Sequence, residues 1–172
     1  MSTDAAPAFR LFLFRHAQAA WATSGMRDFD RELDDGGFAD ADVIADRLAD
    51  LRLVPERILC STARRCRQTA DALKRSMSED LDIRYVDSLY SGGMTVYRDL
   101  IAGQPDIASL MVVGHNPVLE ELLRELVAPA RIGEERPGAY PPAGLAVIDF
   151  DRPPAEGDWP FGRLSLWIEP RR

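Results

Sequence analysis

Hydrophobic positions along the chain follow two patterns, short apolar runs and longer stretches with helical spacing. Residues 9–14 and 110–113 are mostly apolar, which is typical of strands buried on both faces. Further strands are predicted at residues 57–60, 81–86, 145–150 and 164–168. Four helices are predicted. Two cover residues 37–51 and 95–102, a third begins after a cap at Ser61 or Thr62, and a fourth begins at Asn116 and Pro117.

Strands and helices alternate for most of the length, and two strands close the chain. This order predicts an α/β layered fold with a mainly parallel sheet and at least one antiparallel member. A length of 172 residues without repeats or a long linker predicts one domain over 1–172, with residues 1–8 as a flexible tail. Residues 15–36 and 128–144 are predicted loops, and each is a candidate lid or specificity element.

The composition narrows the class of protein. With 46% hydrophobic and 28% charged residues, the chain has the composition of an ordinary soluble globular protein. It has no apolar run near the ~20 residues of a membrane span and no basic signal-peptide start, so we expect a cytoplasmic protein without a membrane partner. A net charge of −7 argues against nucleic-acid binding. Cys60 and Cys66 have no metal or redox spacing, and we expect buried, reduced thiols.

The candidate chemistry lies where predicted strands end. The sequence has two histidines, and His16 and His115 each follow one of the most apolar runs. A third strand end is followed by a cluster of arginines, namely Arg64, Arg65 and Arg67. Because the carboxyl ends of parallel strands meet at one edge of a sheet, we expect these groups to converge. A neutral imidazole can attack phosphorus, and guanidinium groups can hold the transferred phosphoryl group. The pattern therefore predicts a phosphate-handling site, with His16 as nucleophile and Arg15 and Arg65 as phosphate ligands.

Each of these residues taken alone has a simpler structural interpretation. Arg15 and His16 at a strand end could be surface salt-bridge partners, and His115 could be a hydrogen-bonded structural residue. Gly114 allows close backbone approach, and the helix start after His115 offers N–H groups that attract anions. The convergence of three strand ends favours the functional interpretation.

These motifs resemble those of the histidine phosphatase superfamily, whose fold is phosphoglycerate mutase-like. Arg15-His16-Ala17 stands where the family has Arg-His-Gly, and Gly114-His115 matches its second histidine. Residues 61–69 resemble the second motif, whose catalytic arginine falls on Arg65. Arg31-Glu32-Leu33, followed by a glycine and a helix, resembles the Arg-Pro-Leu segment of the short members. The length, Trp21 and the closing residues 166–170 are similar to the small phosphohistidine phosphatases of the SixA type.

The resemblance implies a three-layer α/β/α sandwich and a phosphatase mechanism. His16 would form a covalent phosphohistidine intermediate, which water then hydrolyses. Arg15, Arg65 and His115 would bind the phosphoryl group, with Arg31 as an additional ligand. No metal and no other cofactor is implied.

The sequence departs from the family pattern at two places. Ala17 replaces glycine, which is tolerated if the backbone there keeps a negative φ. The general acid of larger members has one weak counterpart, Asp87, which could equally be a solvated turn residue. An alkoxide leaving group needs a proton more than the imidazole of phosphohistidine does. The lack of a clear general acid in the sequence therefore favours phosphohistidine as the substrate.

We therefore expect a metal-independent phosphoric-group hydrolase that acts on phosphohistidine in a signalling protein. One alternative is a phosphatase for small phosphate monoesters with Asp87 as acid. A second alternative is not an enzyme but a non-catalytic module that binds phosphoproteins. The expected partner is thus a phosphorylated protein or a small phosphorylated molecule.

Overall fold

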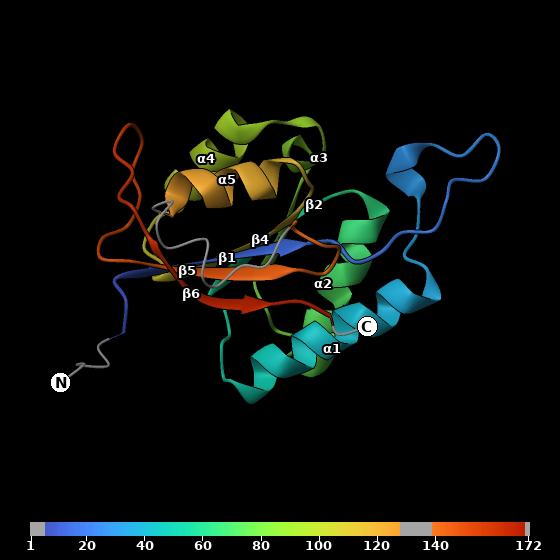
Figure 1. The fold of residues 1–172 in the computed structure, drawn as a ribbon, viewed down its shortest axis with the longest axis horizontal. Coiled ribbons are helices and arrows are strands. Elements are labelled where there is room, and N and C mark those ends of the chain that lie inside the picture. The colour runs from blue at the N-terminus through green and yellow to red at the C-terminus, as the bar shows by residue number, and fades with distance from the viewer. Residues whose placement is uncertain (1–5, 128–138, 171–172) are drawn as a thin grey trace.

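A six-stranded sheet forms the middle layer of the fold in the computed structural model, which describes residues 6–127 and 139–170 (Figure 1). The strand order is β3-β2-β4-β1-β5-β6. The first four strands in this order are parallel, whereas β5 runs antiparallel to β1 and to β6. This arrangement confirms the predicted mainly parallel sheet with an antiparallel addition. The strands are β1 (Phe9–Arg15), β2 (Arg57–Ser61), β3 (Ile83–Val86), β4 (Ser109–Gly114), β5 (Leu145–Phe150) and β6 (Arg163–Ile168).

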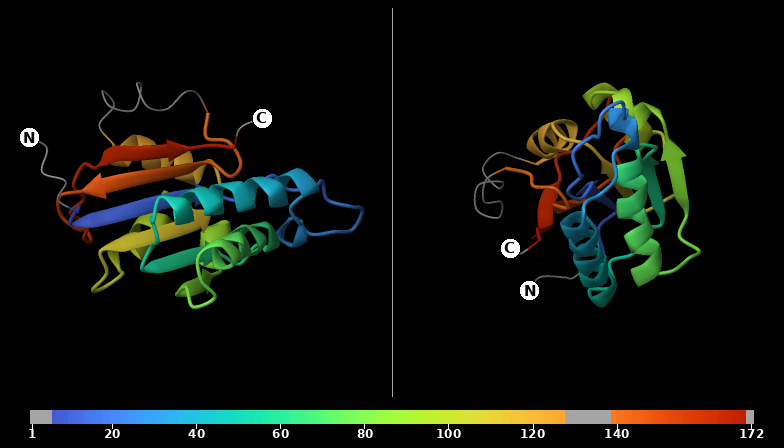
Figure 2. Two further views of the ribbon diagram at one scale, coloured as in Figure 1. Left: turned by 90° about the horizontal axis from the view of Figure 1, so that it is seen from below. Right: turned by 90° about the vertical axis from the view of Figure 1, so that its right-hand side faces the viewer.

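Helices cover both faces of the sheet and complete the three layers (Figure 2). One face carries α1 (Asp35–Asp50) and α2 (Arg64–Ser76), and the other carries α4 (Met94–Ala102) and α5 (Val118–Leu126). Two short elements were not predicted from the sequence, the 3₁₀ turn η1 (Asp28–Asp30) and α3 (Ser88–Ser91). Each is too short to show a hydrophobic period. None of the helices in the described ranges is both long enough and apolar enough to cross a membrane.

The central strand β1 divides its side chains between the two halves of the core. Phe12 and Phe14 pack into the cluster under α1 and α2, whereas Leu11 and Leu13 pack into the cluster under α4 and α5. All four side chains are at most 1% exposed. Burial on both faces is the reason that the middle of the strand, residues 11–14, is continuously apolar rather than alternating.

Helix α1 buries the predicted apolar face in its middle. The buried side chains there are Ala41, Ile44, Ala45 and Leu48. Phe38 and Leu51 were predicted to share this face but are 36% and 50% exposed. Phe38 lies in the first turn and Leu51 is the C-cap residue, so both are at the ends of the helix.

Two predicted helix starts differ in detail from the structure. Ser61 remains in β2, where it is paired with Val86, and α2 begins at Arg64 without a side-chain cap. The Ser61 hydroxyl instead accepts a hydrogen bond from the backbone N–H of Ala63 at 3.2 Å. At α5 the N-cap position is Pro117, and the preceding Asn116 accepts a bond from the backbone N–H of Glu120 at 3.3 Å. Asn116 therefore still accepts from a free backbone N–H of the helix, although it lies one residue before the N-cap instead of at the N-cap.

The loop between β1 and α1 is closed at its base by backbone contacts. Ala19 forms an isolated bridge with Leu33, and the N–H of Asp34 donates to the carbonyl of Gln18 at 3.0 Å. The Asp34 carboxylate then caps α1 by accepting from the N–H of Gly37 at 2.7 Å. A Cβ atom at Gly37 would lie 2.1 Å from the carbonyl oxygen of Gln18. The start of α1 is therefore fitted directly against the backbone two residues after His16.

This close approach makes Gly37 a stability determinant. We expect Gly37→Ala to lower the free energy of unfolding by about 1–3 kcal/mol, because a rigid backbone carbonyl must move to admit the methyl group. Gly93 provides the control, since a Cβ there meets nothing within 4 Å. Gly93→Ala should change stability by less than about 1 kcal/mol. Urea denaturation of both variants measures the difference, and equal midpoints would contradict the packing argument.

Candidate active site

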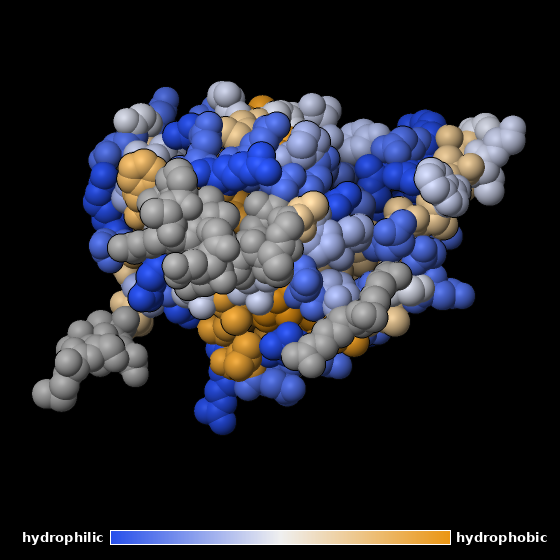
Figure 3. Space-filling view, viewed as in Figure 1, coloured by the Kyte–Doolittle hydropathy of each residue, from blue (hydrophilic) through white to orange (hydrophobic). Residues whose placement is uncertain are grey.

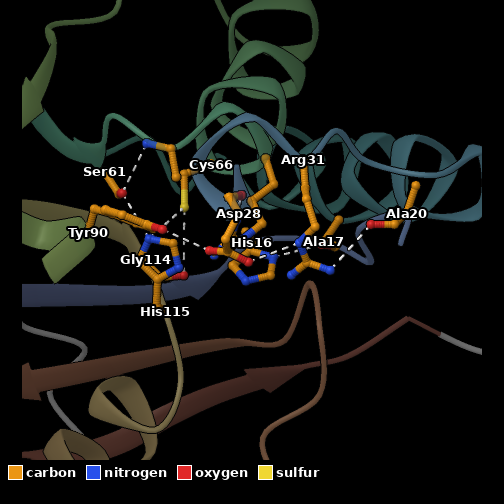
Figure 4. A network of polar contacts seen from close by, with 12 residues as sticks. His16, Ala17, Ala20, Asp28, Arg31, Ser61, Cys66, Tyr90, Gly114 and His115 are labelled. Atoms are coloured by element: carbon orange, nitrogen blue, oxygen red, sulfur yellow. Dashed lines mark hydrogen bonds and ion pairs between the residues drawn. The ribbon is translucent and has the colours of Figure 1, made fainter. Parts of the chain in front are cut away.

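The predicted strand ends meet at the carboxyl edge of the sheet. In the parallel pairing of β1 with β4, Arg15 lies opposite Gly114, so the two following histidines are neighbours. The backbone N–H of His16 donates to the carbonyl of Gly114 at 3.1 Å, and the two imidazole centroids are 5.3 Å apart. Figure 4 shows both rings in the same small region, beside the first turn of α2.

His16 is held in one tautomer in a nearly closed environment. Its side chain is buried, and Nδ1 lies 2.8 Å from the carbonyl oxygen of Ala17. A carbonyl oxygen can only accept, so Nδ1 carries the ring proton and Nε2 keeps its lone pair. Burial is the main cause that lowers the pKa of His16 to about 3, and the nearby His115, Arg65 and Arg15 lower it further. The Ala17 hydrogen bond acts in the opposite direction and is outweighed. The imidazole is therefore neutral at pH 7.

Ala17 fits without strain at the position where the family pattern has glycine. Its side chain is fully buried, and it is not among the residues with positive φ. Its backbone N–H donates to the Thr69 hydroxyl at 3.0 Å, and that hydroxyl donates to the carbonyl of Arg65 at 2.8 Å. The segment after His16 is thereby tied to α2, the helix that carries Arg65.

Arg15 and Arg65 each present an unpaired donor. Arg15 donates from one terminal nitrogen to the Tyr140 carbonyl at 2.9 Å. Arg65 is 6% exposed and uses both terminal nitrogens on Asp28, at 2.8 Å to the backbone carbonyl and 3.0 Å to the carboxylate. Within the described residues, the Nε atoms of both arginines are buried and have no hydrogen-bond partner. A buried unpaired donor is costly, so an anion that accepts from these two atoms would be bound favourably.

Asp28 is a site residue that the sequence prediction missed, and so is Tyr90, whose ring packs against His115. The Asp28 carboxylate accepts from Arg65, from the Tyr90 hydroxyl at 2.8 Å and from Nε of Arg31 at 3.0 Å. Partial burial raises the pKa of Asp28, but the bonds from Tyr90 and Arg65 outweigh it and leave the pKa below its usual value. The one sequence signal is the spacing of Asp28 three residues before Arg31, which is typical of an ion pair across a single turn.

Arg31 is connected to the other site residues by its bond to the Asp28 carboxylate. Its remaining described contact is a 3.3 Å bond from a terminal nitrogen to the Ala20 carbonyl. The structure shows that Arg31 binds the Asp28 carboxylate, and its role as a direct phosphate ligand stays a prediction (Figure 4).

His115 is held from behind by β2 and α2. Its Nε2 lies 2.8 Å from the Ser61 hydroxyl and 3.5 Å from the Cys66 sulfur. Burial is the main cause that lowers the pKa of His115 to about 4, with a further contribution from Arg65. Gly114 is required here, because a Cβ would lie 2.7 Å from the buried Tyr97 hydroxyl that bonds the His115 backbone N–H. Cys66 is a buried free thiol as expected, and so is Cys60.

The remaining predicted residues make no hydrogen bond or ion pair with the two histidines in the described part of the chain. Asp87 is exposed at the start of α3, and in the described part of the chain its carboxylate makes no hydrogen bond or ion pair with His16, Arg65 or His115. Arg64 pairs with Glu32, and Arg67 donates to the Thr62 carbonyl and covers the Tyr85 ring. Across 6–127 and 139–170, no three His, Cys, Asp or Glu side chains are grouped as metal ligands.

The comparisons with known proteins agree with this geometry. Residues 11–91 match the model of the histidine phosphatase superfamily, branch 1. A structure from Agrobacterium tumefaciens, assigned as a phosphohistidine phosphatase SixA, is 42% identical, with a TM-score of 0.84 over 94% of this chain and 98% of that one. A second structure with the same assignment, from Nakamurella multipartita, is 28% identical with a TM-score of 0.80, over 96% of this chain and 99% of that one.

A chloroplastic protein of Arabidopsis thaliana that is itself uncharacterized is also similar in sequence. It is 34% identical over 122 residues, which are 65% of this chain and 56% of that protein. The chain thus spans little more than half the length of this relative. The motifs, the fold and these likenesses lead to one assignment: the chain belongs to the histidine phosphatase superfamily and is of the SixA type.

Proposed function

We propose that the protein is a phosphatase that removes the phosphoryl group from phosphohistidine in a signalling protein, with His16 as nucleophile. One observation carries the proposal: among the described residues, the buried Nε atoms of Arg15 and Arg65 have no hydrogen-bond partner, and both guanidinium charges act on the His16 imidazole, whose Nε2 keeps its lone pair. A phosphoryl group supplies the missing acceptors and offers phosphorus to the lone pair. The names of the two similar SixA structures support the substrate class.

In the first step, Nε2 of His16 attacks phosphorus opposite the leaving nitrogen. A new N–P bond forms on His16 while the N–P bond of the substrate breaks, and the electron pair of that bond stays on the substrate imidazole. The substrate imidazole then takes a proton from water. Arg15 and Arg65 neutralise the charge on the phosphoryl oxygens during the displacement, which requires little other help from the protein.

In the second step, water hydrolyses the intermediate. Its oxygen bonds to phosphorus, the N–P bond to His16 breaks, and inorganic phosphate leaves. The His16 ring returns to the neutral form, with its proton on Nδ1 directed to the Ala17 carbonyl. Because that tautomer is fixed by the backbone, the nucleophile is ready for the next cycle without a rearrangement.

Asp28 and Ser61 act as positioning residues in this proposal. Asp28 occupies both terminal nitrogens of Arg65 and so directs the remaining Nε toward the phosphoryl group. Ser61 fixes the plane of the His115 ring through its 2.8 Å contact with Nε2. Neither side chain would need to exchange a proton with the substrate.

The positions of the carboxylates favour phosphohistidine over an alkyl phosphate. Asp87 is exposed and, in the described part of the chain, makes no hydrogen bond or ion pair with His16, Arg65 or His115, and Asp28 is held in its ionised form by Arg65 and Tyr90. These observations give no support for a protonated carboxyl that would assist an alkoxide leaving group. The imidazole of phosphohistidine is a better leaving group and needs less assistance.

The first prediction concerns the nucleophile. His16→Ala should abolish phosphate release from a phosphohistidine-carrying protein domain, with a loss of at least about 10³-fold in kcat, because it removes the nitrogen that forms the N–P bond of the intermediate. Phosphate release is measured for wild type and variant on this substrate and on an aryl phosphate. Turnover of the aryl phosphate alone would favour the small-monoester function. Full activity of the variant on the phosphohistidine domain would contradict the proposal.

The second prediction concerns the orientation of Arg65. Asp28→Asn keeps the backbone acceptor but weakens the bond to the second nitrogen, so we expect kcat to fall by about 10- to 100-fold at unchanged melting temperature. Asp30→Asn is the matched control, because Asp30 lies in the same turn but pairs with the exposed Arg27. Equal rates for the two variants would exclude a positioning role for Asp28.

The third prediction concerns the charge of the two histidines. Their pKa values of about 3 and about 4 lie below the usual value of 6.5, so both rings should stay neutral as the pH falls from 8 to 5. Since the sequence has two histidines, proton NMR of the ring Cε1–H signals reports both, and His16→Ala assigns them. A midpoint between pH 6 and 7 for His16 would contradict the desolvated site.

A further inference from the structure

A loop stands out beyond the carboxyl edge of the sheet, next to the site. Residues 18–27 run outward between β1 and η1, and both ribbon views show this segment, in blue, projecting past the end of α1 (Figures 1 and 2). In the space-filling view it is a pale projection at the right-hand end of a mostly blue surface (Figure 3). All residues from 21 to 28 are exposed.

The loop carries the most exposed aromatic side chain among the large hydrophobic residues that reach the surface. Trp21 is 91% exposed, and Met26 on the returning arm is 39% exposed. A tryptophan in this position contributes little to the stability of the fold, because its apolar area remains in water. Exposed aromatic groups next to a functional site are typical of surfaces that bind a partner.

The stem of the loop is joined to the site. The N–H of Ala20 donates to the Glu32 carbonyl at 2.8 Å, and the Ala20 carbonyl accepts from Arg31. Arg31 in turn holds Asp28, which holds Arg65. The backbone next to Trp21 is thus fixed relative to the phosphoryl-binding group, so a surface that contacts the indole has a defined place relative to His16.

We propose that Trp21 and Met26 form a docking surface for the protein that carries the phosphohistidine. This inference rests on the proposed function. A small phosphorylated molecule bound at His16 does not need to extend to a loop that projects past the site, whereas a protein surface that presents a phosphorylated side chain must meet it. The partner that fits has an exposed apolar patch beside its phosphohistidine, which covers the indole. Charged side chains at the rim of the patch, from Arg27 and Asp30, suit a protein surface rather than an anionic lipid, which a chain of net charge −7 repels.

The test compares Trp21→Ala with Phe161→Ala on two substrates. Phe161 is 73% exposed, and it lies just before the edge strand β6 rather than at the carboxyl end of β1. The substitution Phe161→Ala therefore removes a similarly exposed ring at a distance from the site. The substrates are a phosphohistidine-carrying protein domain and free phosphohistidine, which share the same scissile bond. For Trp21→Ala we expect KM to rise about tenfold or more on the protein domain, with kcat nearly unchanged, and no change on free phosphohistidine. Phe161→Ala should match wild type on both.

The outcomes separate the docking surface from the proposed function. If wild type does not dephosphorylate the protein domain, the proposed function itself fails. If wild type does so and Trp21→Ala is equally active, the docking surface is wrong and the function stands. Equal losses on both substrates would place Trp21 in the binding of the phosphoryl group rather than of the protein. Sedimentation of wild type and Trp21→Ala at the same concentration tests self-association, and a dimer lost in the variant would show that a second copy occupies the surface instead.

Discussion

The parallel pairing of β1 with β4 is the constraint on which the site depends. In this register Arg15 is opposite Gly114, and the first residue beyond each strand is a histidine. The pairing also continues past the strands, since the N–H of His16 donates to the Gly114 carbonyl. A shift by one residue would turn one histidine to the other face of the sheet. Burial of β1 on both faces prevents such a shift, because it would bring Arg10 or Arg15 into the apolar core.

The second requirement is electrostatic. A nucleophilic imidazole must be neutral, and a phosphoryl group must be surrounded by positive charge. The structure meets both requirements with the same groups. Burial and the guanidinium groups of Arg15 and Arg65 keep the pKa of His16 low, and the Nε atoms of both arginines, which have no hydrogen-bond partner among the described residues, can donate to an anion. Asp28 balances part of this charge, since it accepts hydrogen bonds from both terminal nitrogens of Arg65. The site is therefore preorganised for an anion before any substrate arrives.

The sequence predicted the parts of the site that belong to regular elements. His16, Arg65 and His115 follow strands whose apolar runs are long enough to recognise, and the topology of a parallel sheet then brings them together. Asp28 could not be predicted in the same way, because its place depends on a short turn without hydrophobic periodicity. The contact of Arg15 with the backbone carbonyl of Tyr140 could not be predicted either, because every residue has such a carbonyl. The structure shows that Arg31 binds the Asp28 carboxylate, and a direct contact of Arg31 with the phosphoryl group stays a prediction.

The central claim is that His16 carries the phosphoryl group during turnover. The most direct test is rapid mixing of the protein with a phosphohistidine-carrying domain, followed by an alkaline quench that preserves phosphoramidate bonds. Mass spectrometry of the intact protein and of its peptides then locates any added phosphoryl group. The account predicts a transient phosphoryl group on the peptide that contains His16, formed before inorganic phosphate is released. Phosphate release with no phosphorylated His16, or with the phosphoryl group on His115, would contradict it.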